Sequence, residues 1–249
     1  MLRRLLRWLD PFLGFLALAL LWQASVVIFE IRPYLLPSIG AVAESAWEFR
    51  GEILAHSLTT SVQVLYGFGA AVIGGIVISL LVFFFAPLNR IVMPVVVAIQ
   101  GIPKVALAPL FIVWFGYGMM SKVLMAFLFA FFPVVVSTLG GLAGTPAHLI
   151  EHFRALDASA ATTFWRLRLP SALPSLIDGC KMAMPLAVIG VIVGEFVASE
   201  AGLGNLLLEA NASARTDLMF ASIIAITAIS GLLYGIIHLL GRLVWWRAL

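Results

Sequence analysis

The sequence predicts an all-α polytopic membrane protein with six transmembrane helices. The first observation behind this prediction is composition: 63% of the 249 residues are hydrophobic, 11% are charged, and the mean hydropathy is +1.11. Such a chain has too little polar surface to cover a soluble globule of this size. The second observation is that the apolar residues gather in runs of roughly 20 or more, the length that a helix needs to cross a bilayer. We expect a single domain over residues 1–249.

Six such runs are predicted to be helices rather than barrel strands. They are too long and too uniformly apolar for alternating strands, and a helix satisfies its own backbone hydrogen bonds within lipid. The first run follows Arg3, Arg4 and Arg7, as in a secretory signal, but it is long and no small-residue cleavage site follows it, so we expect it to be retained. The six predicted spans are residues 11–29, 57–85, 91–115, 123–142, 181–198 and 218–244.

Lys and Arg are distributed unevenly between the two sides of these spans. With a cytoplasmic N-terminus, ten cations fall in inner segments and four in outer segments, and cytoplasmic loops carry such an excess. We therefore expect both termini in the cytoplasm. The net charge of +3 reflects this membrane asymmetry and gives no indication of nucleic-acid binding. The inner cations are Arg3, Arg4, Arg7, Arg90, Arg154, Arg166, Arg168, Lys181, Arg242 and Arg247, and the outer ones are Arg32, Arg50, Lys122 and Arg215.

The predicted outer segments contain short helices and turns. Pro33 and Pro37 end the first span, and Ser38 is placed to cap a short amphipathic helix after it. Gly202-Leu203-Gly204 predicts a turn, and because no Lys-Ser or Lys-Thr follows these glycines, a phosphate-binding loop is not expected. The single cysteine, Cys180, excludes an intrachain disulfide and a multi-thiolate metal site.

A polar segment with the sequence EHFRALDASAATTFWRLRLPSALP, residues 151–174, separates the fourth and fifth spans. Helix-forming residues with apolar positions three or four apart predict a helix over residues 148–165. Pro170 is expected to break the chain, with a second short helix beginning near Ser171. Two interpretations fit this pattern: a bent helical element held in the groove of a soluble partner, or an interfacial helix that Trp165 anchors among lipid headgroups.

Nearly the whole chain resembles the permeases of the nitrate, sulfonate and taurine group of ABC importers. The polar segment has the spacing of that family's cytoplasmic EAA loop, with Glu151, Ala155, Asp157 and Leu169-Pro170 at the corresponding offsets. Asp157 stands where the family usually has Gly. The other matching pieces are Leu36-Pro37-Ser38, His56-Ser57-Leu58, IPKVALAPL at residues 102–110, Trp114-Phe115-Gly116-Tyr117-Gly118, Phe132-Pro133, Leu169-Pro170-Ser171-Ala172-Leu173-Pro174, Gly194-Glu195, Gly202-Leu203-Gly204 and Trp245-Trp246-Arg247.

The resemblance implies a type I importer permease fold in a bacterial inner membrane. It implies a homodimer of this chain around a translocation pathway, two ATPase subunits on the cytoplasmic face and a periplasmic or extracellular substrate-binding protein. It also implies that the chain is not itself an enzyme and needs no cofactor, because ATP and Mg²⁺ belong to the ATPase; the chain has no Gly-Lys-Ser/Thr loop. The ATPase-coupling loop, about residues 146–178, is expected to act through Glu151, Arg154, Ala155, Leu156, Asp157, Ala158, Ala161, Leu169 and Pro170.

Polar residues inside the predicted spans are candidates for the translocation pathway. Burying a charge in lipid costs several kcal/mol unless it is paired or hydrated. Lys104, with Gln100 about one turn away, and Glu195 are such residues. We expect them to line the pathway for an anion or to pair as a gate; the alternative is a snorkelling lysine or an ion pair that only fixes helix packing.

Two other functions compete with this interpretation. His148, Glu151 and His152 match the H-x-x-E-H pattern of a class of zinc peptidases, but no third ligand is evident, so no metal is expected. An ion-driven secondary carrier is the other competitor, although repeated halves and several intramembrane acids are missing. For the substrate we expect a small organic or inorganic anion such as a sulfonate, taurine or nitrate, with riboflavin or a pyrimidine vitamin precursor as the alternative.

Overall fold

The computed structural model describes the backbone of residues 2–244 and the side chains of residues 13–243, apart from those of three single positions. Within these residues every regular element is helical, which confirms the predicted all-α class. Several residues of the sequence prediction lie outside the described side chains. These are Arg3, Arg4 and Arg7 at the N-terminus and Trp245, Trp246 and Arg247 at the C-terminus.

Most of the helices are long and a few are short connecting elements. The short ones include a 3₁₀ turn, η1, and a π-helical turn, η2. In chain order the elements are α1 (Leu2–Ile28), α2 (Ile39–Glu48), α3 (Arg50–Phe84), α4 (Ala86–Gln100), η1 (Lys104–Leu107), α5 (Ala108–Phe115), α6 (Met119–Ala143), α7 (Ala147–Ala155), α8 (Ala160–Thr163), η2 (Phe164–Arg168), α9 (Leu169–Ala198), α10 (Leu203–Ala212) and α11 (Thr216–Val244).

Four helical segments of the described chain are long and apolar enough to cross a membrane, or five if one bent pair counts as a span. They correspond to four of the six predicted spans, namely α3, α6, the continuous helix Ala160–Val197, and α11. The apolar part of α1, Leu13–Ile28, is shorter than these. The helix Arg50–Phe84 has 35 residues, so at ~1.5 Å per residue it is about 50 Å long and exceeds the bilayer core.

The third predicted span, residues 91–115, is wrong as a single helix. The chain bends by 90° between Arg90–Gln100 and Lys104–Phe115. Pro103 explains the break, because it lacks a backbone N–H and disfavours helical geometry in the residue before it. Gly101 ends α4, and Pro109 lies in the first turn of α5, where proline is tolerated.

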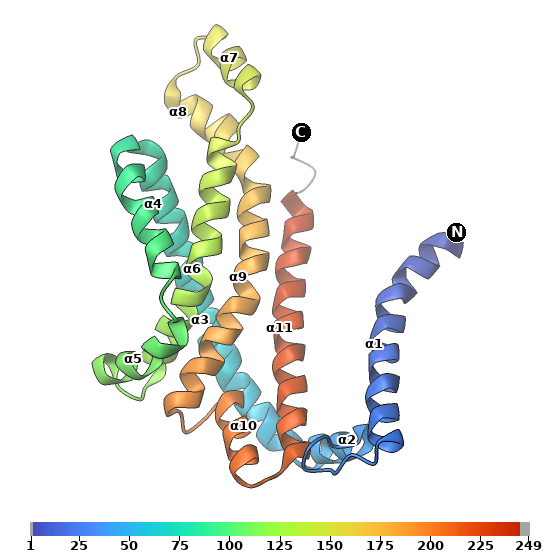
Figure 1. Cartoon of the computed structure of the whole chain (residues 1–249). Coiled ribbons are helices and arrows are strands. Elements are labelled where there is room, and N and C mark those ends of the chain that lie inside the picture. Colours follow the sequence, from blue (N-terminus) through green and yellow to red (C-terminus); the bar gives the residue numbers. More distant parts are fainter. Residues whose placement is uncertain (1, 245–249) are drawn as a thin grey trace.

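The long helices form a bundle with two distinct ends (Figure 1). α3, α6 and α9 pack together, with α11 beside α9. At one end, which we call the loop end, the chain between α6 and α9 forms α7 and α8; α2 and α10 lie at the other, the α10 end. α3 and α6 both end at the loop end. The bent pair α4 and α5, which follows α3 in the chain, therefore returns the chain toward the α10 end before α6 begins.

Small residues allow the central helices to approach closely. Gly190 of α9 lies against the backbone of α6, where an added Cβ would come within 2.7 Å of the Met125 carbonyl oxygen and 2.8 Å of the Ala126 Cα. A Cβ on Gly67 of α3 would collide with the Ala126 Cβ and would lie 2.9 Å from the Val123 carbonyl oxygen of α6. Packing between helices in lipid depends on such close contacts because lipid tails are as apolar as the side chains. The α3–α6–α9 contact is therefore the structural core.

The helix predicted after Ser38 is confirmed. The Ser38 hydroxyl accepts a hydrogen bond from the Ala41 backbone N–H at 3.2 Å and caps α2. α1 is held to this corner by two hydrogen bonds, from Trp22 Nε1 to the Pro37 carbonyl at 3.0 Å and from the Ile39 N–H to Gln23 Oε1 at 3.1 Å. The rest of α1 stands apart from the bundle (Figure 1).

Replacing Gly190 by Ala is expected to destabilise the bundle, because the added methyl group meets the α6 backbone and neither helix can move without disturbing the core. Overpacking of this kind costs about 1–3 kcal/mol. The measurement is thermal unfolding of the detergent-solubilised protein. Gly69→Ala is the matched control, since nothing lies within 4 Å of its added Cβ. Equal melting temperatures for the two variants would contradict this packing.

Candidate functional site

A buried carboxylate joins three elements at the α10 end. Glu195 of α9 is 1% exposed, and its Oε1 accepts a hydrogen bond from the Thr60 hydroxyl of α3 at 2.8 Å. Its Oε2 accepts from the Gly204 backbone N–H at 2.7 Å. The Leu203 N–H donates to Thr60 Oγ1 at 2.8 Å. Both carboxylate oxygens are therefore bonded, and one of them caps the first turn of α10 from a different helix.

Two glycines make this arrangement possible. Gly202 has φ of +114°, a backbone conformation that residues with a Cβ rarely adopt, and an added Cβ would collide with the Glu195 carboxylate. A Cβ on Gly204 would lie 2.8 Å from the Glu195 Cβ. His56 of α3 completes the junction, with its Nδ1 2.9 Å from the Gly202 N–H. The turn predicted at 202–204 ends at Gly202 in the structure, because Leu203 and Gly204 already belong to the first turn of α10. Both glycines are required by Glu195.

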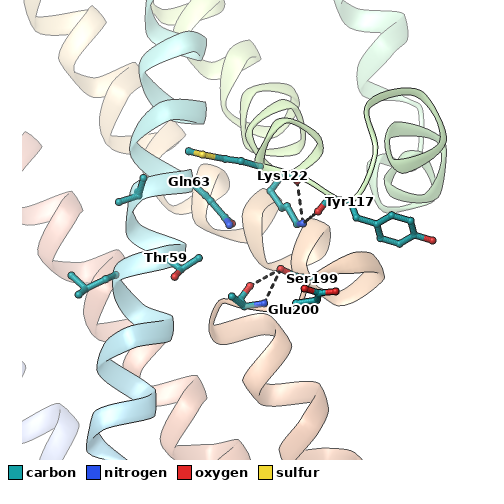
Figure 2. Close-up of a pocket in the computed structure, with 11 residues that line it drawn as sticks. Thr59, Gln63, Tyr117, Lys122, Ser199 and Glu200 are labelled. Atoms are coloured by element: carbon teal, nitrogen blue, oxygen red, sulfur yellow. Dashed lines mark hydrogen bonds between the residues drawn. The ribbon is translucent and has the colours of Figure 1, made fainter.

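A pocket of about 840 Å³ lies beside this junction (Figure 2). We call it the outer pocket because Lys122 and Glu200, which line it, belong to segments that the sequence predicts to be outer. Three elements of the chain line it: the first half of α3, the start of α6 and the turn between α9 and α10. Such a volume is in the range that small-molecule sites occupy. The lining residues are Leu58, Thr59, Val62, Gln63, Tyr117, Gly118, Met119, Lys122, Ser199, Glu200 and Ala201.

Two buried polar side chains belong to the wall of the outer pocket. Lys122 is 3% exposed, and its Nζ donates to the backbone carbonyls of Tyr117 at 2.5 Å and Gly118 at 3.1 Å. Gln63 is 6% exposed, and its Oε1 has no hydrogen-bond partner among the described residues. An ammonium group and an amide with unused hydrogen-bonding capacity, both in the lining of one pocket (Figure 2), are suited to hold a polar ligand.

Lys122 was missed as a site residue by sequence analysis, which assigned it to an outer segment. The structure places it in the first turn of α6, where Gly194 of α9 lets its side chain pass: a Cβ on Gly194 would lie 3.2 Å from Lys122 Cγ. A lysine at the start of an apolar run, just after Gly116 and Gly118, is the signal that was available.

The predicted pathway residues Lys104 and Glu195 do not pair with each other among the described residues. The Lys104 ammonium lies 5.3 Å from the centre of the Phe129 ring, at the bend between α4 and α5. Glu195 bonds to Thr60 and Gly204 instead, and no ion pair among the described residues joins it to Lys104. Gln100, the last residue of α4, is exposed.

The predicted coupling loop forms α7, a tight turn, α8 and η2, which together we call the α7–η2 segment (residues 147–168). Asp157, at the position where the resembling family has Gly, adopts φ of +54°. Asp tolerates this left-handed conformation better than most residues, so the turn is kept. Ser159 then caps α8 by accepting from the Thr162 N–H at 3.1 Å.

The predicted break at Pro170 is wrong. The helical path is interrupted at the turn around Asp157 instead, and from Ala160 one continuous helix runs through α8 and η2 into α9. The π-helical turn η2 explains the continuity. The Leu169 N–H bonds to the Phe164 carbonyl, five residues back, and this wider turn leaves room for the Pro170 ring. Pro170 lies in the first turn of α9.

The remaining predicted coupling residues lie mostly on the surface of the α7–η2 segment. Leu169 is an exception, because it packs against a small buried cluster of Leu142, Phe164 and Ala172. The described residues include no group of three or more His, Cys, Asp or Glu placed to hold a metal ion, and His148, Glu151 and His152 form no such group. The predicted residues that are exposed are Glu151, Arg154, Ala155, Leu156, Asp157 and Ala161, with Ala158 partly exposed.

Comparison with known proteins gives a consistent result. Residues 71–245 match the family model described as "binding-protein-dependent transport system inner membrane component". A probable ABC transporter permease protein of Haemophilus influenzae is 34% identical, over 96% of this chain and 98% of its own length. The formylaminopyrimidine transport permease protein ThiX of Halalkalibacterium halodurans is 39% identical over 82% and 81% of the two chains.

A third relative and a solved structure extend the comparison. The taurine transport system permease protein TauC of Escherichia coli is 30% identical over 98% of this chain and 94% of its own length. A chain of the inward-facing MetNI methionine ABC transporter has a TM-score of 0.69 at 18% identity and covers 79% of this chain and 98% of that chain. This structural match shows the same fold.

Replacing Thr60 by Val is expected to lower the free energy of unfolding by about 1–3 kcal/mol, because it leaves a buried Glu195 oxygen and the Leu203 N–H without partners. The neighbouring Thr59→Val is the control, since the Thr59 hydroxyl bonds only to the Ala55 carbonyl of its own helix. Thermal unfolding of both variants measures the difference. If the melting temperature of Thr60→Val equals those of Thr59→Val and the unchanged protein, the Glu195 junction does not stabilise the fold.

Proposed function

The chain belongs to the family of binding-protein-dependent transport system inner membrane components, the permease subunits of ABC importers, and from this premise we propose how it works. Two copies enclose the translocation pathway, and a separate ATPase on the cytoplasmic side drives them through the α7–η2 segment. A substrate-binding protein outside the membrane delivers the substrate at the α10 end. The observation that carries the proposal is the α7–η2 segment, which projects from one end of the bundle (Figure 1). The outer pocket lies toward the other end, because Ser199, Glu200 and Ala201, just before α10, line it.

The exposure of the α7–η2 segment supports a soluble partner. Leu156, at the turn, is 66% exposed, and it lies between the short polar helix α7 and Asp157. An exposed apolar side chain at the tip of a polar projection is suited to the groove of another protein. The excess of Lys and Arg in the segments at this end supports a cytoplasmic position for it.

The α7–η2 segment is joined to the bundle by aromatic contacts that can transmit a force. Phe164 of η2 lies 4.9 Å from Phe84 and 6.2 Å from Phe83 between ring centres, and both belong to the last turn of α3. α3 continues without a break to Thr60 and His56 at the α10 end. A displacement of the segment by the ATPase would therefore move α3, α6 and α9 as one body relative to the second copy. This motion would open or close access to the outer pocket between the two subunits, which is alternating access by rigid-body motion.

Exposed polar groups at membrane depth support a second copy of the chain. Gln100 ends α4 with its side chain exposed, next to the bend that carries Lys104. Polar side chains within membrane spans face a protein interior or a water-filled cavity because lipid cannot solvate them. A second copy facing α4 and η1 would enclose Gln100 and Lys104 in a pathway between the two subunits. This arrangement gives both residues the role that the sequence predicted.

Two substrate classes fit the chain. A small anion, such as a sulfonate, taurine or nitrate, is favoured by the membrane cations Lys104 and Lys122 and by the likeness to the taurine permease. A pyrimidine vitamin precursor or riboflavin is favoured by the higher identity to the permeases named for formylaminopyrimidine and riboflavin. Uptake measurements with both classes, in the presence of the binding protein, separate these candidates.

Leu156→Asp is expected to abolish association with the ATPase, because it places a charge where an apolar contact forms. The measurement is copurification of the ATPase with the tagged permease, together with ATP-driven uptake. Leu35→Asp is the control: Leu35 is similarly exposed, in the connection just before α2, which lies at the opposite end of the bundle. This variant should retain the ATPase. A Leu156→Asp permease that keeps its ATPase and transports normally would remove the coupling role of this segment.

Lys122→Met is expected to reduce uptake at least about tenfold, because the outer pocket loses the only cation among its lining residues. Lys104→Met tests the pathway role of the bend in the same assay. Lys122→Arg, which keeps the charge, should retain part of the uptake. Assembly with the ATPase is checked for each variant. Correctly assembled Lys122→Met protein that transports at the normal rate would exclude the outer pocket from the pathway.

A further inference from the structure

A second pocket, of about 440 Å³, lies at the loop end, and we call it the arginine pocket. It is formed between the last turn of α3 and the α7–η2 segment, so it is distinct from the outer pocket. Its walls combine aromatic rings, small side chains and two guanidinium groups. The lining residues are Phe83, Phe84, Ile150, Arg154, Ala158, Ala160, Thr163, Phe164 and Arg168.

The arginine pocket carries an uncompensated positive charge. Arg154 comes from α7 and Arg168 from η2, and the lining contains no Asp or Glu. Neither guanidinium takes part in an ion pair among the described residues; Arg168 contacts the Phe83 ring, 5.1 Å from its centre. Two like charges facing one pocket repel each other, and an anion between them removes this repulsion. Guanidinium groups bind the oxygens of phosphate in bidentate geometry.

The position of the arginine pocket indicates where this anion comes from. Its floor, Phe83 and Phe84, is the end of a membrane-crossing helix, and Phe84 is 57% exposed. Trp165, beside the pocket on η2, is also exposed. Exposed aromatic rings at the end of a span are typical of the membrane interface, where lipid headgroups lie. α8 lies near the level of the turn between α3 and α4, whereas α7 extends further from the bundle (Figure 1).

We propose that the arginine pocket binds the phosphate of an anionic phospholipid headgroup. Arg154 and Arg168 hold the phosphate oxygens, and the apolar walls accept the adjoining part of the lipid. Basic pockets at the cytoplasmic ends of membrane helices bind such headgroups. Because Arg154 lies on α7 and Phe84 on α3, the bound lipid fixes the α7–η2 segment against the bundle. The site is independent of the substrate and of the outer pocket.

The test compares the full-length chain in nanodiscs of phosphatidylcholine alone and of phosphatidylcholine with phosphatidylglycerol. The readouts are lipid retained in native mass spectrometry and the melting temperature. The unchanged protein is expected to retain phosphatidylglycerol and to melt at a higher temperature with it. Arg168→Gln and Arg154→Gln should each bind this lipid at least about tenfold more weakly, because each removes charge-assisted hydrogen bonds.

Arg166→Gln is the matched control, since it removes one exposed arginine of the same turn without changing the pocket lining. It should retain the lipid like the unchanged protein. Equal retention by all three variants, or equal loss, overturns the proposal. So does a rise in melting temperature with inorganic phosphate alone, which would make the site one for free phosphate. If Arg154→Gln and Arg168→Gln keep the rise in melting temperature with phosphatidylglycerol but no longer copurify with the ATPase, the two arginines belong to the ATPase contact and the proposal is overturned.

Discussion

The structure depends on one buried carboxylate. Glu195 lies within a membrane-crossing helix, where an unbonded charge would cost several kcal/mol, yet both of its oxygens accept hydrogen bonds from α3 and α10. This requirement explains its neighbours: Thr60 supplies a hydroxyl, and Gly202 and Gly204 leave space for the carboxylate. The α10 end is therefore a fixed junction, and the outer pocket lies against it with Lys122 and Gln63 in its wall.

The central helices connect this junction to the loop end. α3 is one unbroken helix with Thr60 near one end and Phe84 near the other, and Gly67 and Gly190 hold α6 between α3 and α9. Closely packed helices of this kind move as a body rather than bend. Phe164 ties the α7–η2 segment to Phe84. The helices that line the outer pocket are thus the ones that contact the α7–η2 segment, which we assign to the ATPase contact. A transporter driven by an ATPase on a separate chain requires such a connection.

Much of this was predictable from sequence, and what was not has physical causes. The lengths of the hydrophobic runs predicted four of the spans, and the Ser38 cap predicted α2. Run length and capping are both properties of the local sequence. The break at Gly101–Pro103 was not predicted as a sharp bend, since proline within an apolar run is compatible with a kinked helix. Pro170 was expected to end a helix, but a π turn accommodates it. Lys122 was missed because its burial depends on Gly194 of a distant helix, which no local pattern reveals.

We propose that nucleotide binding by the ATPase at the loop end changes access to the outer pocket at the α10 end. The direct measurement uses Thr59→Cys, a residue of that pocket, in a background where the single native cysteine is replaced by Cys180→Ala. A membrane-impermeant thiol reagent added from the outside is reacted with the assembled transporter, with and without a non-hydrolysable ATP analogue. The analogue is expected to change the reaction rate of the thiol introduced by Thr59→Cys several-fold. An unchanged rate in a complex that demonstrably binds the analogue would contradict it.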